Sequence, residues 1–365
     1  MGVRMRVSVI IPYYNREDLL LNTLKSFQLQ TINKDEYEIV IIDDGSNENI
    51  DNKIKSLHLN INISYNYFQR DSKSCAALAR NRGIEKSRGE ILIFLDCDQI
   101  VYPDFLEEHL YPFDKFGNNN DILQFGLRKY MNKTISFDPD RQLITNKTDF
   151  SNDSRHYVFQ IFSHNMSVVR SSWHLIFSNN ISTSKKAIDK FGGFDDNFKG
   201  WGLEDTEFGY RLYKNGVKIV YNPYIEVVHQ YHEYSFDENR YIQWNRNFNY
   251  FTSKHPEIPV ILQGILLDFF DPAKRAAKEQ KGIQHVWLHS YIKFENALRC
   301  LDDRPASKNN NLEITLIRPD IDKIEKIQDA DDKVYQVICF KDKDRDLLYW
   351  VQLYNTNPNL KLYAI

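Results

Sequence analysis

Short apolar runs alternate with amphipathic stretches from Val7 to Leu110. The apolar runs cover residues 7–11, 38–42, 61–68 and 91–95. Helical stretches are predicted at 18–30 and 76–87, and Asn15 is the expected N-cap of the first. This alternation is typical of βαβ units, so it predicts an α/β fold with a mixed, mostly parallel sheet and helices on both faces.

The rest of the chain changes character twice. Residues 121–190 are rich in Asn, Ser, Asp and Lys and predict strands joined by long loops. We place one α/β domain at 1–235, a helical extension at 236–302 and a small β-rich appendage at 303–365. Helices are predicted at 204–214, 239–254 and 284–301, and strands at 217–221, 225–229, 312–317, 333–340, 347–353 and 360–363.

Charge and cysteine content narrow the class of protein. The 47 Lys and Arg residues nearly balance 50 Asp and Glu residues, which argues against a nucleic-acid-binding surface spread over the molecule. The four cysteines form no CxxC pair, so neither a zinc site nor a disulfide framework is indicated. We expect no signal peptide and no transmembrane segment. A cytoplasmic protein is the simplest expectation, with peripheral association at the inner face of the membrane as an alternative.

Acidic residues follow the last of the early apolar runs. Asp96 and Asp98 come directly after the predicted strand at 91–95, where an open α/β sheet binds ligands and a hard divalent cation finds oxygen ligands. If the reaction breaks a bond between a sugar and a nucleotide diphosphate, a cation bridging the two phosphates would stabilise the departing diphosphate. Asp98 is the natural direct ligand of such a cation.

Two turns should line the same ligand-binding crevice at the carboxyl ends of the predicted strands. The first strand ends in Pro12, Tyr13 and Asn15, and the second in Asp43 and Asp44. A carboxylate can accept the N–H of uracil or bind ribose hydroxyls, and Pro12 and Tyr13 can pack on the base. These turns carry no basic group to read a purine. The alternative is that residues 44–46 form only a turn and a helix cap.

Five ordered motifs carry a family resemblance. They are VSVIIPYYN at 7–15, IDDGS at 42–46, ARNRG at 79–83, GEILIFLDCD at 89–98, and GGFD followed by WGLED within 192–205. The sequence resembles the family-2 inverting glycosyltransferases of the GT-A fold. It is similar to bacterial chondroitin-type polymerases and to the β-galactosyl and N-acetylgalactosaminyl transferases.

The resemblance implies roles for the donor side. Asp96 would contact the ribose or the donor sugar, and His229 would be the second protein ligand of Mn²⁺, with Mg²⁺ as the alternative ion. A structural histidine is the other interpretation of His229, and His232 is expected at the surface. Arg80 would bind phosphate or ribose, unless its helix face is simply solvated, and Asn165 would touch the donor sugar.

The resemblance also implies roles for the acceptor side. Asp205 would be the base that deprotonates the acceptor hydroxyl, Glu204 would bind the acceptor, and Trp201 would stack on a sugar face. Alternatively, Glu204 and Asp205 only complement the dipole of the helix that they begin.

These features together predict an enzyme that transfers a hexose or N-acetylhexosamine from a UDP-sugar to a hydroxyl group with inversion. The acceptor would be a glycan, a lipid-linked glycan or a glycopeptide in bacterial surface polysaccharide or glycoconjugate synthesis, and the C-terminal region could form a homodimer. A catalytically silent glycan-binding or scaffold protein and a sugar nucleotidyltransferase are the alternatives. The latter should carry a glycine-rich loop after the first strand, which this chain lacks.

Overall fold

The chain folds into two compact units in a computed structural model. The described residues are 4–116, 121–134, 150–162, 164–233, 237–270, 283–301, 316–317, 325–328 and 334–339. One unit comprises Met1–Asp153 and Trp173–Ser235, and the other comprises Ser154–Ser172 and Phe236–Ile365. The first unit contains the motifs that follow the early strands.

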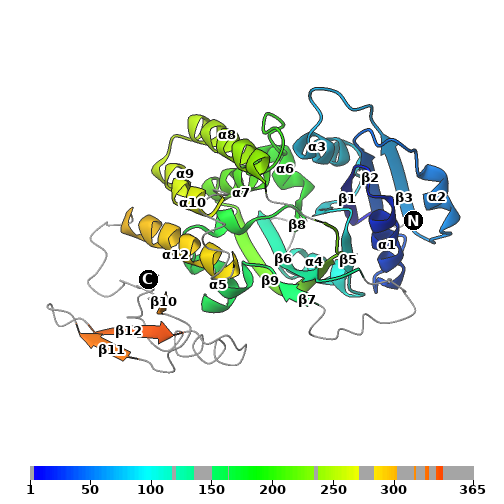
Figure 1. Cartoon of the computed structure of the whole chain (residues 1–365). Coiled ribbons are helices and arrows are strands. Elements are labelled where there is room, and N and C mark those ends of the chain that lie inside the picture. The colour runs from blue at the N-terminus through cyan, green and yellow to red at the C-terminus, as the bar shows by residue number, and fades with distance from the viewer. Residues whose placement is uncertain are drawn as a thin grey trace. The chain divides into compact units, whose positions relative to one another are not determined.

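Helices and strands alternate through the first unit (Figure 1). Its strands are β1 (Val7–Tyr13), β2 (Tyr37–Asp43), β3 (Asn62–Tyr67), β4 (Ile91–Leu95), β5 (Gln99–Val101), β6 (Ile122–Met131), β7 (Phe150–Asn152), β8 (Asn180–Ser184) and β9 (Lys218–His229). Its helices are α1 (Glu17–Ser26), α2 (Asp51–Ser56), α3 (Ala76–Lys86), α4 (Phe105–Phe116), α6 (Lys185–Phe191) and α7 (Glu204–Lys214).

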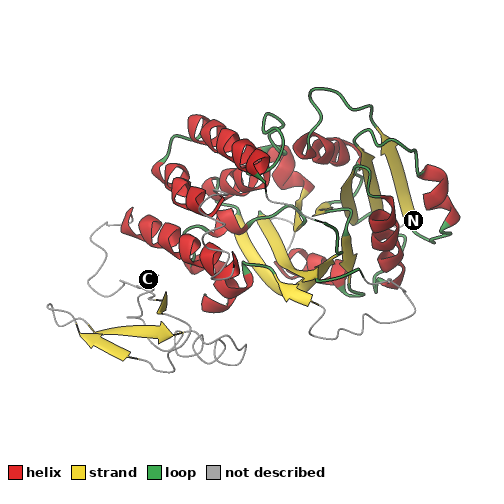
Figure 2. Ribbon diagram, in the orientation of Figure 1, coloured by secondary structure: helices red, strands yellow, loops and turns green. Residues whose placement is uncertain are grey.

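These strands form one mixed sheet, flanked by helices (Figure 2). Their order is β3-β2-β1-β4-β8-β6-β9-β5, and β7 pairs with β6. Strands β1 to β4 are mutually parallel, whereas β8 runs antiparallel to both β4 and β6. The carboxyl ends of β1, β2 and β4 therefore meet at one edge of the sheet, where open α/β sheets bind ligands.

The helices that pack on the sheet determine which side chains reach its ligand-binding edge. Side chains of α1 and α4, including Leu24 and Phe105, pack with the core face of β1 and β2, while Ala79 of α3 packs against Val40 and Ile42. Gly83 allows α3 to lie close to β1, because a Cβ at this position would come 2.2 Å from the Ile10 Cγ2 atom.

Two details differ from the sequence-based predictions, and a third agrees. The strands predicted at 217–221 and 225–229 are one strand, β9, whose pairing with β6 shifts register between Phe125 and Leu127. The prediction that Asn15 caps α1 is wrong, because Arg16 occupies the N-cap and makes no side-chain capping bond. The predicted helix at 204–214 is confirmed as α7.

The second unit is mainly helical. It contains α5 (His156–Ile161), α8 (Glu238–Lys254), α9 (Ile258–Ile261), α10 (Leu267–Phe270), α12 (Ile283–Leu301), and the strands β10 (Leu316–Ile317), β11 (Glu325–Gln328) and β12 (Val334–Cys339). The carboxylate of Glu295 on α12 accepts hydrogen bonds from the backbone N–H groups of Arg170 and Ser171 at 2.9 and 2.8 Å. This buried carboxylate ties the segment 154–172 to α12.

The predicted helices at 239–254 and 284–301 are confirmed as α8 and α12. Strands predicted at 347–353 and 360–363 lie outside the described residues. Within the described parts, none of the helices combines the length and apolar character needed to cross a membrane.

We predict that Gly83→Ala lowers the free energy of unfolding by about 1–3 kcal/mol, since the new methyl group must displace Ile10. Chemical denaturation measures this change. In the control Gly264→Ala, the new Cβ has its nearest neighbour 3.5 Å away, in ordinary contact, so a much smaller effect is expected. Equal effects of the two changes would contradict close packing of α3 on β1.

Candidate active site

Arg80 lies at the centre of the acidic edge of the sheet. Its guanidinium donates to the Asp96 carboxylate at 3.4 Å and to the Glu204 carboxylate at 3.2 Å. The Arg80 side chain is only 6% exposed, whereas Asp96 is 37% exposed. Burial lowers the pKa of Arg80, but the charges of Asp96 and Glu204 outweigh it and raise the pKa, so the guanidinium stays charged. Arg80 thus joins the two acidic motifs.

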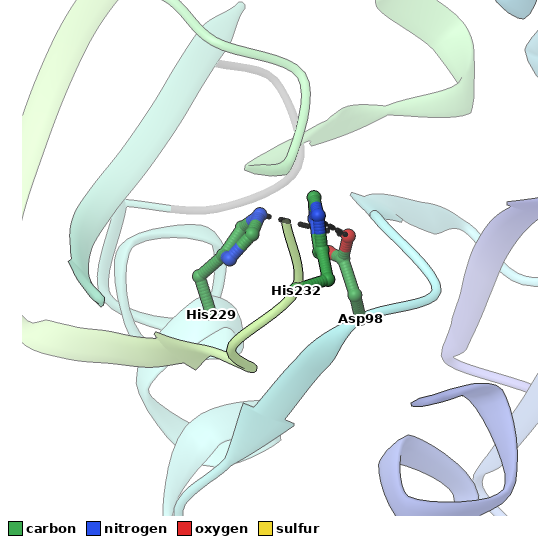
Figure 3. Close-up of side chains that lie close together, drawn as sticks. All are labelled: Asp98, His229 and His232. Atoms are coloured by element: carbon green, nitrogen blue, oxygen red, sulfur yellow. Dashed lines mark ion pairs between the residues drawn. The ribbon is translucent and has the colours of Figure 1, made fainter. Parts of the chain in front are cut away.

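Asp98 forms a cluster with two histidines (Figure 3). Its Oδ2 atom lies 3.5 Å from Nε2 of His229 and 3.4 Å from Nε2 of His232. His229 ends β9, where it pairs with Gln99, next to Asp98. The expectation that His232 lies at the surface is wrong, because the chain beyond β9 brings its ring back against Asp98. All three side chains are mostly buried.

The donor atoms of this cluster fit a divalent cation. One ligand atom from each of Asp98, His229 and His232 lies within 4.8 Å of the other two. Burial lowers the pKa of His229 to about 4, so its ring is neutral near pH 7, as metal binding requires. Burial opposes ionisation of Asp98, but His232, His229 and Arg16 outweigh it and lower its pKa.

A strained turn presents the second acidic pair. Gly200, Gly202 and Leu203 all have positive φ angles, of 72°, 98° and 73°. Leu203 adopts the left-handed conformation at the N-cap of α7, which costs energy for a residue with a Cβ. Glu204 and Asp205 therefore begin α7. Trp201 lies within the turn itself.

Both carboxylate oxygens of Asp205 accept hydrogen bonds from the backbone. Its Oδ2 atom accepts the backbone N–H of Ser178 at 3.3 Å, and its Oδ1 atom accepts that of Thr206 at 2.8 Å. Burial and the neighbouring Glu204 charge nevertheless raise the pKa of Asp205 to about 7. A carboxylate with this pKa can exchange a proton near neutral pH, as a general base must. Glu207, further along α7, is fully buried and paired with Arg211.

The two turns at the ends of β1 and β2 are hydrogen-bonded to each other. The Asn15 N–H donates to Ser46 Oγ, and the Asn15 side-chain oxygen accepts the N–H of Asn47, both at 2.9 Å. Asp43 accepts the Ser46 N–H at 2.7 Å and the hydroxyl of Tyr65. Much of the hydrogen-bonding capacity of Asp43 therefore maintains the turn.

Basic and aromatic side chains surround Asp44. Arg70 Nη1 lies 2.9 Å and Arg82 Nη1 lies 3.7 Å from its carboxylate. The turns themselves carry no basic residue, as expected, but Arg70 and Arg82 from other elements lie against Asp44. Tyr13 is only 3% exposed and belongs to the core, whereas Tyr14 is 43% exposed and stacks with Arg70, whose guanidinium carbon lies 4.1 Å from the ring centroid.

The first unit thus brings together most of the residues proposed from the sequence. Pro12 is partly buried in β1 beside these turns. Asn165 belongs to the second unit, so its proximity to the donor stays a prediction. The sequence-based reasoning missed Arg16, which lies 3.8 Å from Asp98, and His232. Arg16 directly follows the first turn motif, a position that could have signalled it.

Comparison with known families agrees with this geometry. Residues 8–177 match the model of glycosyl transferase family 2, and residues 160–234 match the model described as the N-terminal domain of galactosyltransferase. Residues 8–177 thus resemble the family 2 glycosyltransferases, and the predicted family resemblance is confirmed.

Individual relatives cover different parts of the chain. The validoxylamine A glucosyltransferase of Streptomyces hygroscopicus subsp. limoneus is 26% identical over 69% of this chain and 57% of its own length. The chondroitin synthase of Escherichia coli is 28% identical over 58% of this chain and 32% of its own length. The chain therefore spans between about a third and somewhat more than half of these relatives.

A structural neighbour confirms the fold. The crystal structure of S. aureus TarS 1-349 matches with a TM-score of 0.53 and 16% identity, over 81% of this chain and 83% of that one. The predicted GT-A fold class is therefore confirmed.

We predict that Asp205→Asn raises the melting temperature at pH 8 but changes it little at pH 4. The folded-state pKa of about 7 exceeds the ordinary value of 3.8, so ionisation of Asp205 destabilises the folded protein as pH rises between these values. Melting curves of both proteins from pH 4 to 8 measure the difference. The exposed control Asp35→Asn should show no comparable gain, and a difference independent of pH would contradict the raised pKa.

Proposed function

We propose that the protein transfers a hexose or N-acetylhexosamine from a UDP-sugar to a hydroxyl acceptor with inversion. The observation that carries this proposal is the Arg80 bridge, which connects Asp96, beside Asp98, to Glu204, beside Asp205. Arg80 thus holds a carboxylate assigned to the donor and a carboxylate assigned to the acceptor close together. A silent relative would have no need to keep this arrangement together with the raised pKa of Asp205.

A uridine diphosphate sugar suits the donor side. Tyr14 offers an exposed ring for the base, and Asp44 can bind a base N–H or ribose hydroxyls beside Arg70 and Arg82. The two arginines also supply positive charge near a nucleotide. A UDP-GlcNAc complex of S. aureus TarS supports a nucleotide sugar as the donor. The pathway we propose is bacterial surface polysaccharide or glycoconjugate synthesis, which the similarity to chondroitin synthase supports.

We assign Asp98, His229 and His232 to a divalent cation. Mn²⁺ fits two imidazoles and one carboxylate better than Mg²⁺, which prefers oxygen ligands throughout. Such an ion, when bound, would offset the negative charge that develops on the departing diphosphate. Arg16, which lies 3.8 Å from Asp98, would add a further positive charge on the same side.

The acceptor side performs the proton transfer. The acceptor oxygen attacks the anomeric carbon from the face opposite the diphosphate, and the bond between that carbon and the phosphate oxygen breaks. The carboxylate of Asp205 takes the proton of the acceptor hydroxyl. Glu204 binds another acceptor hydroxyl, and Trp201 contacts a sugar face. An α-linked donor therefore gives a β-linked product.

We predict that UDP binding requires a divalent cation. Asp98→Ala should lose this metal-dependent binding of UDP. His232→Ala should weaken Mn²⁺ binding by about 10–100-fold, because it removes one of the three protein ligands. Calorimetry with Mn²⁺ alone and then with UDP measures both effects. His58→Ala, a histidine in the loop after α2, is the control, and equal Mn²⁺ affinity in both histidine variants would remove His232 from the site.

We predict that Asp205→Asn lowers the transfer rate by about 10²–10⁴-fold while UDP binding is retained. Wild-type kcat should rise with pH and level off above about pH 7, because the base must be ionised. Glu204→Gln should raise the acceptor KM and move this rise to lower pH, because the Glu204 charge raises the pKa of Asp205. Near-normal transfer by Asp205→Asn would refute the assignment.

A further inference from the structure

We propose that Asn179 binds a hydroxyl group of the donor sugar and so contributes to the choice of donor. This inference rests on the proposed function and adds a residue that determines specificity. Asn179 directly precedes β8 and is 4% exposed. Within the described part of the chain, neither its side-chain oxygen nor its side-chain nitrogen has a hydrogen-bond partner.

The sheet places Asn179 next to the residues assigned to donor and acceptor. Strand β8 is antiparallel to β4, and its first residue, Asn180, pairs with Leu95. Extending the same register by one position places Asn179 across from Asp96. On its other side, the Ser178 N–H donates to the Asp205 carboxylate. Asn179 is thus held between the donor-side carboxylate and the base.

The face of the sheet can be assigned from neighbouring side chains. Phe94 and Ile181 pair with each other, two positions before Asp96 and two positions after Asn179. Phe94 packs against Phe194 and against Phe208 of α7. Because side chains alternate along a strand, Asp96 and Asn179 belong to the Phe94 face. On this face Asp96 accepts a hydrogen bond from Arg80, which also donates to Glu204.

The next residue, Asn180, is the first residue of β8 and has a purely structural role. Its side-chain oxygen lies 3.1 Å from Nε2 of His109, and its side-chain nitrogen donates to the Leu127 carbonyl at 3.3 Å. Both amide atoms of Asn180 are therefore satisfied inside the core. The amide of Asn179 is equally buried but lacks such bonds, and a buried amide without partners destabilises a fold. A ligand that supplies the missing partners explains its presence.

The chemistry of the amide defines the ligand group. A primary amide donates through nitrogen and accepts through oxygen, and a sugar hydroxyl can do both in return. A site with a buried polar group strongly rejects a substrate that lacks the matching hydroxyl, because the amide then stays unpaired. Asn179 would therefore discriminate between a sugar with a hydroxyl at one ring position and the analogue deoxygenated there.

The test compares wild-type protein, Asn179→Ala and the matched control Asn180→Ala. The UDP-hexose that the wild type uses best is paired with its singly deoxygenated analogues, and kcat/KM is measured for each. Wild type should discriminate against one analogue by at least about 100-fold. Asn179→Ala should reduce this ratio to within about threefold for that position alone. Asn180→Ala should keep the wild-type ratio.

Melting curves and calorimetry with UDP and Mn²⁺ accompany the kinetics. Asn179→Ala should retain UDP affinity and melt no lower than wild type, since it removes an unsatisfied buried amide, whereas Asn180→Ala should melt lower. The assignment of Asn179 alone would be overturned if Asn179→Ala left the ratio of kcat/KM between the UDP-hexose and its deoxygenated analogue unchanged. It would also be overturned if Asn179→Ala lost as much stability as Asn180→Ala. A wild-type protein that uses no UDP-sugar of the panel would overturn the proposed function and this inference together.

Discussion

The arrangement of the site depends on one buried guanidinium. Asp96 and Glu204 come from motifs more than a hundred positions apart, and both bind Arg80. Without a positive charge between them, these carboxylates would repel each other in a partly buried environment, where charges are screened less than in water. Gly83 lets α3 carry Arg80 close to the sheet. Packing of an apolar helix face therefore determines the spacing of the charged groups.

The same edge of the sheet contains several groups that cost stability. Leu203 has a left-handed backbone, ionised Asp205 is opposed by burial, and the Asn179 amide has no partner within the described chain. Each feature is unfavourable for the fold alone, and strained or unsatisfied groups of this kind often mark functional sites. Arg80 compensates only part of this cost, because the pKa of Asp205 remains raised in its presence.

Patterns that are local in sequence predicted the structure best. Helix α7 was predicted with its observed bounds because acidic residues begin it and Asn215-Gly216 ends it. Strand β8 was harder to predict, since its sequence NISTS is polar yet fully buried, with Ser182 bonded to His109. The place of His232 depends on the path of the chain after β9, which residue spacing does not encode. The basic surroundings of Asp44 arise in the same way, from Arg70 and Arg82 on other elements.

The central claim is that this edge of the sheet binds a metal and a nucleotide. The most direct test is a crystal of the protein grown with Mn²⁺ and UDP, with anomalous scattering recorded for manganese. The account predicts an anomalous peak between the side chains of Asp98, His229 and His232, with the diphosphate beside it. Bound UDP together with a manganese peak remote from all three side chains would contradict it.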